Sequence, residues 1–136
     1  MNAYQSALNL IGRLLIAALF LPAGLAKLAS FEGTLGYFAS LGIPAPVFAL
    51  VVTIAIEILG SIALLVGFQT RLVAIIMAIF TLLAAVSGHA YWAAPADAVF
   101  IAKLLFFKNI AVMGGLLALA SAGAGSFSVD ARKAVK

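Results

Sequence analysis

The sequence predicts an all-α integral membrane protein, a four-helix antiparallel bundle with a short interfacial helix between its first and second spans. Hydrophobic residues make up 66% of the 136 residues and charged residues only 9%, which is too apolar for a soluble domain. The apolar residues also fall into four long segments joined by short polar or glycine-containing loops. We therefore expect residues 1–136 to form a single membrane domain in contact with the lipid bilayer.

The composition excludes several kinds of chemistry. The chain has no cysteine, which excludes disulfides, thiol relays and iron–sulfur clusters within it. Its single histidine cannot build a multi-histidine metal site or supply both axial ligands of a haem. We expect no metal and no cofactor held covalently or by coordination by this chain alone. The pI is about 9.8, but the basic residues lie beside membrane spans, where they set topology, so we expect no nucleic-acid partner.

The first predicted span covers residues 7–27 and contains Arg13, with Pro22 near its end. A basic start followed by an apolar run is also typical of a signal peptide. Arg13 interrupts that apolar run, and three further spans follow it, so the segment is interpreted as a membrane helix. Proline inside a span kinks the helix, and neighbouring helices of a bundle accommodate the distortion.

The interfacial helix follows directly. Phe31, Leu35, Phe38 and Leu41 recur at spacings of four, three and three, which gives one apolar helical face. Ser30 is the predicted N-cap, and Gly42 with Pro44 ends the helix. This helix either covers the mouth of the bundle or simply anchors the loop at the membrane surface.

The remaining spans are predicted at residues 47–67, 72–89 and 99–122. The second span has 21 residues and is about 30 Å long as a helix, the thickness of the bilayer's hydrocarbon core. The turn at residues 68–71 is so short that the third span must run antiparallel beside the second. The small, polar and basic tail at residues 123–136 is expected to be frayed and solvated.

The basic residues predict the orientation. Four spans place both termini on one side of the membrane, and that side collects Arg71, Arg132, Lys133 and Lys136. The loops of the other side carry only Lys27. By the positive-inside rule both termini are cytoplasmic in this multi-pass topology, and both long loops face outwards.

The only ionisable residue of the second span is Glu57, near the membrane midplane. A charge at this depth costs a few kcal/mol unless it is paired, protonated or hydrated. Counting about 1.5 Å per residue places Lys108 and Arg13 at a comparable depth on other spans. We therefore predict an interior network in which Glu57 pairs with Lys108, Arg13 or both, and Asn109 adds an amide.

Two roles of this network stay open. It either forms a functional polar site or is purely structural, because buried ion pairs can also serve only to fix the register of helices. Lys27 lies near the outer boundary, where it either snorkels to the surface or lines the mouth of a pocket. His89, at the outer end of the third span, is either a hydrogen-bonded interfacial residue or a proton carrier. No catalytic residue is assigned. The candidate ligand-binding residues are Arg13, Lys27, Glu57, His89, Lys108 and Asn109.

Several loose motifs, in this order and spacing, resemble the DoxX family over nearly the whole chain, from about Leu10 to Asp130. The motifs are Arg13, the FLPAGLAK run from Phe20 to Lys27, the GIP from Gly42 to Pro44, Glu57 with Gly60, Gly67, Arg71, His89, and FFKNIAVMGGLL from Phe106 to Leu117. The resemblance implies a bacterial inner-membrane protein with a four-helix bundle. Family members have been linked to thiosulfate-to-quinone electron transfer, quinol oxidase complexes and oxidative-stress assemblies.

Two functions from different classes follow. The first is the membrane subunit of a redox system that binds a quinone, with Lys108, Glu57 and His89 bonding its oxygens. Such a subunit needs a redox partner protein to supply electrons. The ring and tail of the quinone would contact Phe20, Trp92, Phe106 and Phe107. The alternative is a non-enzymatic small transporter or scaffold whose ion pairs are structural; a carrier with four spans would need to be a homo-oligomer.

Overall fold

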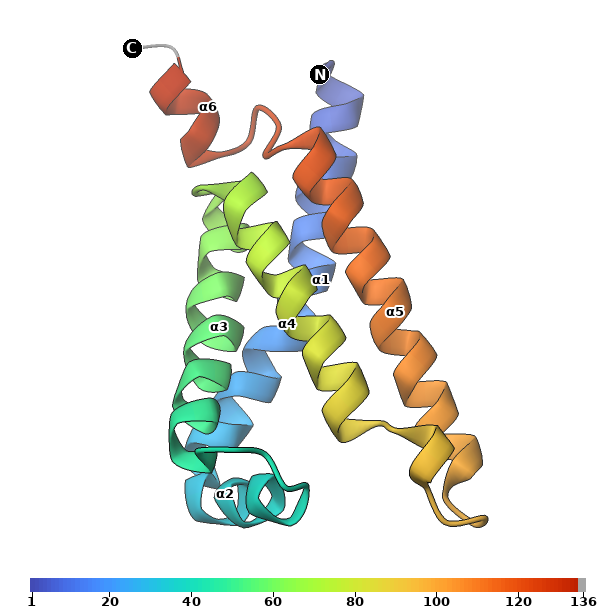
Figure 1. Cartoon of the computed structure of the whole chain (residues 1–136). Helices are drawn as coiled ribbons and strands as arrows, with labels where there is room; N and C mark the ends of the chain where they lie inside the picture. The colour runs from blue at the N-terminus through green and yellow to red at the C-terminus, as the bar shows by residue number, and fades with distance from the viewer. Residues whose placement is uncertain (135–136) are drawn as a thin grey trace.

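The structure, a computed structural model, describes residues 1–134, and these form helices and loops without any strand. Four helices are long and apolar enough to cross a membrane, and successive ones run in opposite directions (Figure 1). They are α1 (Ala3–Ala29), α3 (Pro46–Val66), α4 (Thr70–Gly88) and α5 (Val99–Ala122). This arrangement confirms the all-α fold and the four-helix antiparallel bundle.

The first helix begins four residues earlier than predicted because its N-terminus carries a capping box. Asn2 Oδ1 accepts a hydrogen bond from the Gln5 N–H at 2.8 Å, and Gln5 Oε1 accepts one from the Asn2 N–H at 2.9 Å. Each side chain thus satisfies a backbone donor that would otherwise have no partner at the helix end. Pro22 lies inside α1 without ending it.

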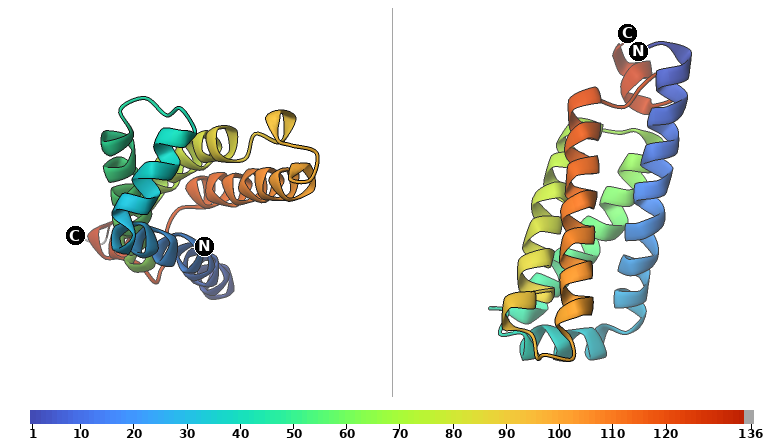
Figure 2. Two further views of the ribbon diagram at one scale, coloured as in Figure 1. Left: turned by 90° about the horizontal axis from the view of Figure 1, so that it is seen from below. Right: turned by 90° about the vertical axis from the view of Figure 1, so that its right-hand side faces the viewer.

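A short helix, α2 (Phe31–Ser40), lies across one end of the bundle, which confirms the predicted helix between the first two spans (Figures 1 and 2). It packs on α3, and its Tyr37 hydroxyl reaches the last residue of α4, Gly88. The 3₁₀ turn η1 (Tyr91–Ala93) connects α4 to α5 at the same end. We call this the α2 end, and the opposite end, which holds the N-terminus and residues 123–134, the tail end.

The four long helices pack mainly as two pairs. α1 packs on α3 and α4 packs on α5, while α3 and α4 join the pairs. α5 has little contact with α1, and the two helices diverge toward the α2 end (Figures 1 and 2). α1 and α5 are therefore much less closely packed against each other than the helices within each pair. The buried core cluster consists of Phe20, Leu64, Ala74, Met77, Ala78, Leu116 and Leu119.

The prediction of a frayed tail is wrong for its described part. The Asp130 carboxylate accepts hydrogen bonds from the backbone N–H groups of Gln69 at 2.8 Å and Thr70 at 2.9 Å. The N–H of Asp130 in turn donates to the Gly67 carbonyl at 2.9 Å. The N-cap residue of α4, Gln69, makes no capping hydrogen bond with its own side chain, so Asp130 of the tail supplies the cap. A short helix, α6 (Val129–Ala134), continues from this contact, and Lys136 lies outside the described residues.

Two side chains at the tail end also hold the C-terminus of α5. Arg71 Nη1 donates to the carbonyl oxygens of Ala120 at 2.8 Å and Ser121 at 2.5 Å. Asn9 Nδ2 donates to the Gly123 carbonyl at 2.7 Å. These carbonyls have no partner within the helix, and a cation is favoured at the negative end of its dipole. Arg71 therefore has a structural role besides its predicted effect on topology.

Candidate functional site

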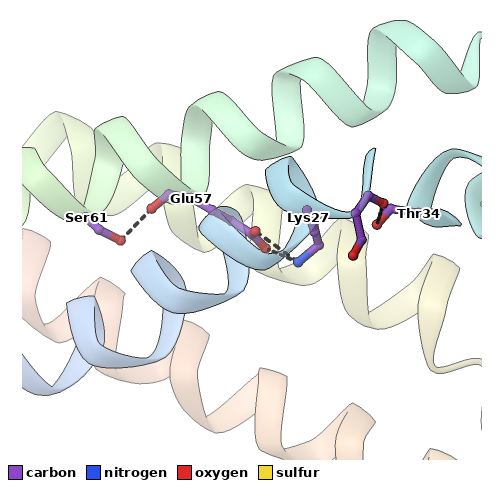
Figure 3. A network of polar contacts seen from close by, with 5 residues as sticks. Lys27, Thr34, Glu57 and Ser61 are labelled. Carbon is purple, nitrogen blue, oxygen red and sulfur yellow. Dashed lines mark hydrogen bonds and ion pairs between the residues drawn. The ribbon is translucent and has the colours of Figure 1, made fainter. Parts of the chain in front are cut away.

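A largely buried ion pair joins α1 and α3. The Lys27 ammonium donates to both carboxylate oxygens of Glu57, at 3.0 Å to Oε1 and 2.9 Å to Oε2 (Figure 3). The Glu57 side chain is 7% exposed and the Lys27 side chain 26% exposed. The carboxylate is therefore desolvated and depends on Lys27 for neutralisation, while Lys27 keeps some access to its surroundings.

A close approach of the two helices places this pair. A Cβ atom added to Gly24 of α1 would lie 2.8 Å from Ile58 Cγ1 and 2.9 Å from Glu57 Cβ of α3. Only glycine leaves room for that contact. Lys27 lies three residues after Gly24 and so shares its helical face. The lysine side chain is therefore held beside Glu57.

The predicted partners of Glu57 were wrong, because Lys27 forms the ion pair and neither Arg13 nor Lys108 does. Side chains on a helix tilt toward its N-terminus. Since α1 and α3 are antiparallel, Lys27 tilts toward the tail end and Glu57 toward the α2 end, and the two side chains converge. Arg13 also tilts toward the tail end, away from Glu57.

Arg13 instead joins α3 to the tail. It is fully buried, and its guanidinium donates to the Leu64 carbonyl at 3.0 Å and to the Phe127 carbonyl at 2.5 Å. Leu64 lies seven residues after Glu57, about 10 Å further along α3. The Gly67 backbone leaves no room for a Cβ beside Arg13 Nη1. Arg13 therefore caps the C-terminus of α3 and does not belong to the layer of Glu57.

His89 and Lys108 lie on the packed helix pair α4 and α5. His89 directly follows α4 at the α2 end, and Lys108 lies in the half of α5 nearer that end. Lys108 is exposed and Asn109 is partly buried. In the described part of the chain α5 packs mainly on α4, with at most weak contact to α3, and the ion pair of Glu57 is with Lys27.

An aromatic cluster at the α2 end is centred on Tyr91. The Tyr91 ring centroid is 5.3 Å from those of Trp92 and Phe106 and 6.0 Å from that of Phe107. Lys103 Nζ lies 5.8 Å from the Tyr91 centroid, within cation–π range. Three of the predicted ring-lining residues thus meet here. The fourth, Phe20, packs in the core with its centroid 6.5 Å from that of Phe80.

Comparison with known proteins gives the family. The model of the DoxX family matches residues 8–90, more than half of the chain. The chain belongs to the DoxX family. Inner membrane protein YphA of Escherichia coli is 38% identical over 131 residues, which are 96% of this chain and 94% of that protein. Inner membrane protein YqjF of the same organism is 38% identical over 121 residues, 89% of this chain and 88% of that protein.

A more distant relative of this DoxX protein carries a functional name. "Putative oxidoreductase CatD" of Bacillus subtilis is 35% identical over 78 residues, which are 57% of this chain and 56% of that protein. No solved structure matches the chain. The segment matched by the family model includes Arg13, Lys27, Glu57 and His89, whereas Lys108 and Asn109 follow it.

The six candidate residues of this DoxX protein therefore occupy three places. Lys27 and Glu57 form a buried ion pair between α1 and α3, which can hold or exchange a proton. His89 and Lys108 offer hydrogen-bond donors next to aromatic rings, with Asn109 beside Lys108 on α5. Arg13 is structural. Within residues 1–134, no three His, Asp or Glu side chains gather into a group that could hold a metal ion.

Proposed function

We propose that this DoxX protein is the membrane subunit of a redox system and binds a quinone or a similar hydrophobic ligand. In this proposal the ligand ring lies near the α2 end, between the diverging helices α1 and α5. One observation carries the proposal: the Lys27–Glu57 pair, with a Glu57 side chain only 7% exposed, lies between α1 and α3 beside this proposed position. A mostly apolar space with a few placed polar groups is typical of ligand sites.

Helical faces favour a lysine on each side of the proposed ring position. At the tail end, Asn9 of α1 and Gly115 of α5 line one groove between these helices. Lys27 follows Asn9 by 18 residues, or five full turns, and therefore shares its face. Lys108 precedes Gly115 by seven residues, or about two turns. The two lysines are thus expected on either side of the bound ring.

The chemistry of these groups suits a quinone. The ammonium groups of Lys27 and Lys108 can donate to its carbonyl oxygens, and the nearby aromatic cluster can pack on its ring. A quinone that is reduced takes up protons at those oxygens, and the Lys27–Glu57 pair can supply or accept a proton there. The electrons come from a partner protein. The name of the relative CatD supports a redox role.

The same proposal includes location and orientation. The names of YphA and YqjF support placement in a bacterial inner membrane. Arg71, Arg132 and Lys133 lie at the tail end, which favours a cytoplasmic tail end by the positive-inside rule. Since the chain has no cysteine, Lys133→Cys and Asp97→Cys can each be labelled selectively. A membrane-impermeant maleimide should label Asp97→Cys in intact spheroplasts and Lys133→Cys only after lysis; the reverse pattern would overturn the orientation.

Ligand binding can be measured through the chain's single tryptophan. Trp92 belongs to the aromatic cluster beside Lys108, so a quinone bound there should quench its fluorescence in a saturable way. We expect Lys108→Met, which removes a charged donor to the ligand, and Glu57→Gln, which removes the carboxylate that positions Lys27, to weaken binding about tenfold each. Lys133→Met, a lysine at the tail end, is the matched control and should bind as the wild type does.

Two results would overturn the proposal. The first is the absence of saturable quenching in the wild-type protein. The second is quenching that Glu57→Gln and Lys108→Met leave unchanged while both variants keep their fold. Thermal unfolding of each variant in the same detergent shows whether the fold is kept, so a folded variant with unchanged affinity counts against a role of that residue in binding.

A further inference from the structure

A groove lies between the tail-end halves of α1 and α5, away from the proposed ring site at the α2 end. Its volume is about 650 Å³, within the usual size range of ligand sites. Most of the residues that line it are apolar or small, among them Leu8, Gly12, Gly115 and Leu119.

Two glycines that line the groove have open space beside them. A Cβ atom added to Gly12 of α1 or to Gly115 of α5 would meet no atom within 4 Å. By contrast, the Cβ position of Gly24 is blocked by Ile58 and Glu57, where helices do pack closely. Gly12 and Gly115 therefore do not serve contact between helices of this chain. They leave a slot whose floor is helix backbone.

The slot is closed at one end. The Cβ position of Gly125 in the tail lies 3.5 Å from Met1 Cε and 3.6 Å from Asn9 Cβ. The tail is held there by the hydrogen bond from Asn9 to the Gly123 carbonyl. A flexible chain that ends inside the membrane fits such a slot. A spanning helix from a second copy would have to continue past the closed end.

The other end of the slot leads toward the proposed ring site. Lys108, Gly115 and Ala122 follow one another at intervals of seven residues and so lie along one face of α5. The face is about 21 Å long from Lys108 to Ala122, compared with about 30 Å for the hydrocarbon core. A ligand whose ring lies near Lys108 can therefore extend its chain along this face to the tail end.

We propose that the groove between α1 and α5 is a tail site that binds the isoprenoid chain of the quinone-type ligand. The inference rests on the proposed function and adds a selection for chain length to it. Within a bilayer the chain gains little from leaving lipid, so its contribution comes from packing along Gly12, Gly115 and Leu119. Ligands with a long chain should then bind more tightly than ligands with the same ring and no chain.

The test compares two probes, a long-chain ubiquinone and a ubiquinone analogue with a methyl group in place of the chain. Gly115→Leu fills the slot, and we expect it to weaken binding of the long-chain probe about tenfold while leaving the methyl analogue unchanged. Gly114→Leu is the matched control, because a Cβ there also meets nothing within 4 Å, yet Gly114 lies about 100° away around the helix and does not line the groove. Partitioning into detergent affects all variants equally.

The outcomes separate this inference from the proposed function. If the methyl analogue does not bind the wild-type protein, the proposed function fails. If both probes bind and Gly115→Leu affects them equally or not at all, the tail site is wrong while the ring site stands. A changed oligomeric mass of Gly115→Leu with unchanged affinities would show that a second copy occupies the groove. As an independent readout, a long-chain probe with a photoreactive chain end should crosslink near Leu8 or Leu119; crosslinks confined to Phe100 or Ile101 would overturn the proposal.

Discussion

Lys27 and Glu57 meet from opposite directions across the interface of α1 and α3, each tilted toward the N-terminus of its own helix. Both carboxylate oxygens lie within 3.0 Å of one ammonium group. This geometry neutralises a carboxylate that would otherwise stand desolvated in the membrane. It also makes the pair sensitive to any change in the distance between the two helices.

Removing one partner of this pair should cost more than removing both. We expect Lys27→Met to destabilise the protein by about 3 kcal/mol, the lower end of the range for a buried pair, because Lys27 is partly exposed. The double variant Lys27→Met with Glu57→Gln should recover most of this loss. Unfolding free energies in detergent measure the coupling. Lys108→Met with Glu57→Gln serves as the control and should show additive effects, since these residues do not pair.

The close approach at Gly24 gives a second prediction. Gly24→Ala places a methyl group against Ile58 and Glu57 and must push α1 away from α3. We expect a loss of about 1–3 kcal/mol from overpacking, together with a weakened ion pair. Gly114→Ala is the control, because its methyl group meets nothing within 4 Å, and it should be neutral or slightly stabilising. Equal unfolding temperatures for the two variants would contradict the packing described here.

Arg13 should control the tail as well as α3. Arg13→Met removes the donors to the Leu64 and Phe127 carbonyls, and leaving such buried acceptors without partners costs about 3 kcal/mol or more. Arg13→Lys should rescue only part of this loss, because one ammonium lacks the planar fork of donors. Trypsin cleavage at Arg132 and Lys133 reports on the docked tail. We expect trypsin to cleave Arg13→Met faster than the wild type. Equal cleavage rates for the two proteins would refute the anchoring role.

Asp130 gives a pH dependence. Partial burial raises the pKa of Asp130, but hydrogen bonds from the Thr70 and Gln69 N–H groups outweigh it and lower the pKa below the ordinary value of 3.8. Since the folded pKa is lower, the stabilisation is fully present above pH 3.8 and is lost as the pH falls through the folded pKa. Asp130→Asn should lower the unfolding temperature at neutral pH. As the pH is lowered to about 3, the unfolding temperature of the variant should then fall less than that of the wild type. Parallel pH curves for the two proteins would exclude this contribution.

The sequence by itself determined the membrane class, the four spans and the helix α2, because hydrophobic length and period are local properties of the chain. It also identified Glu57 as a charge that must find a partner. It did not identify the partner, since counting residues gives the depth of a Cα atom and not the direction of its side chain. Gly24 three residues before Lys27 was an available signal, and the FLPAGLAK motif contains both residues.

Only the tertiary structure decided which helices are neighbours. It separated Arg13 from Glu57, assigned Lys108 to a helix that packs mainly on α4, and docked the tail through Asp130 onto the start of α4. Tertiary contacts in this protein join residues up to 120 positions apart in the sequence, such as the hydrogen-bonded Ser6 and Ser126. No local sequence pattern encodes such contacts. The physical reason is that backbone groups at helix ends and charges within the membrane take whichever partner the packing brings near.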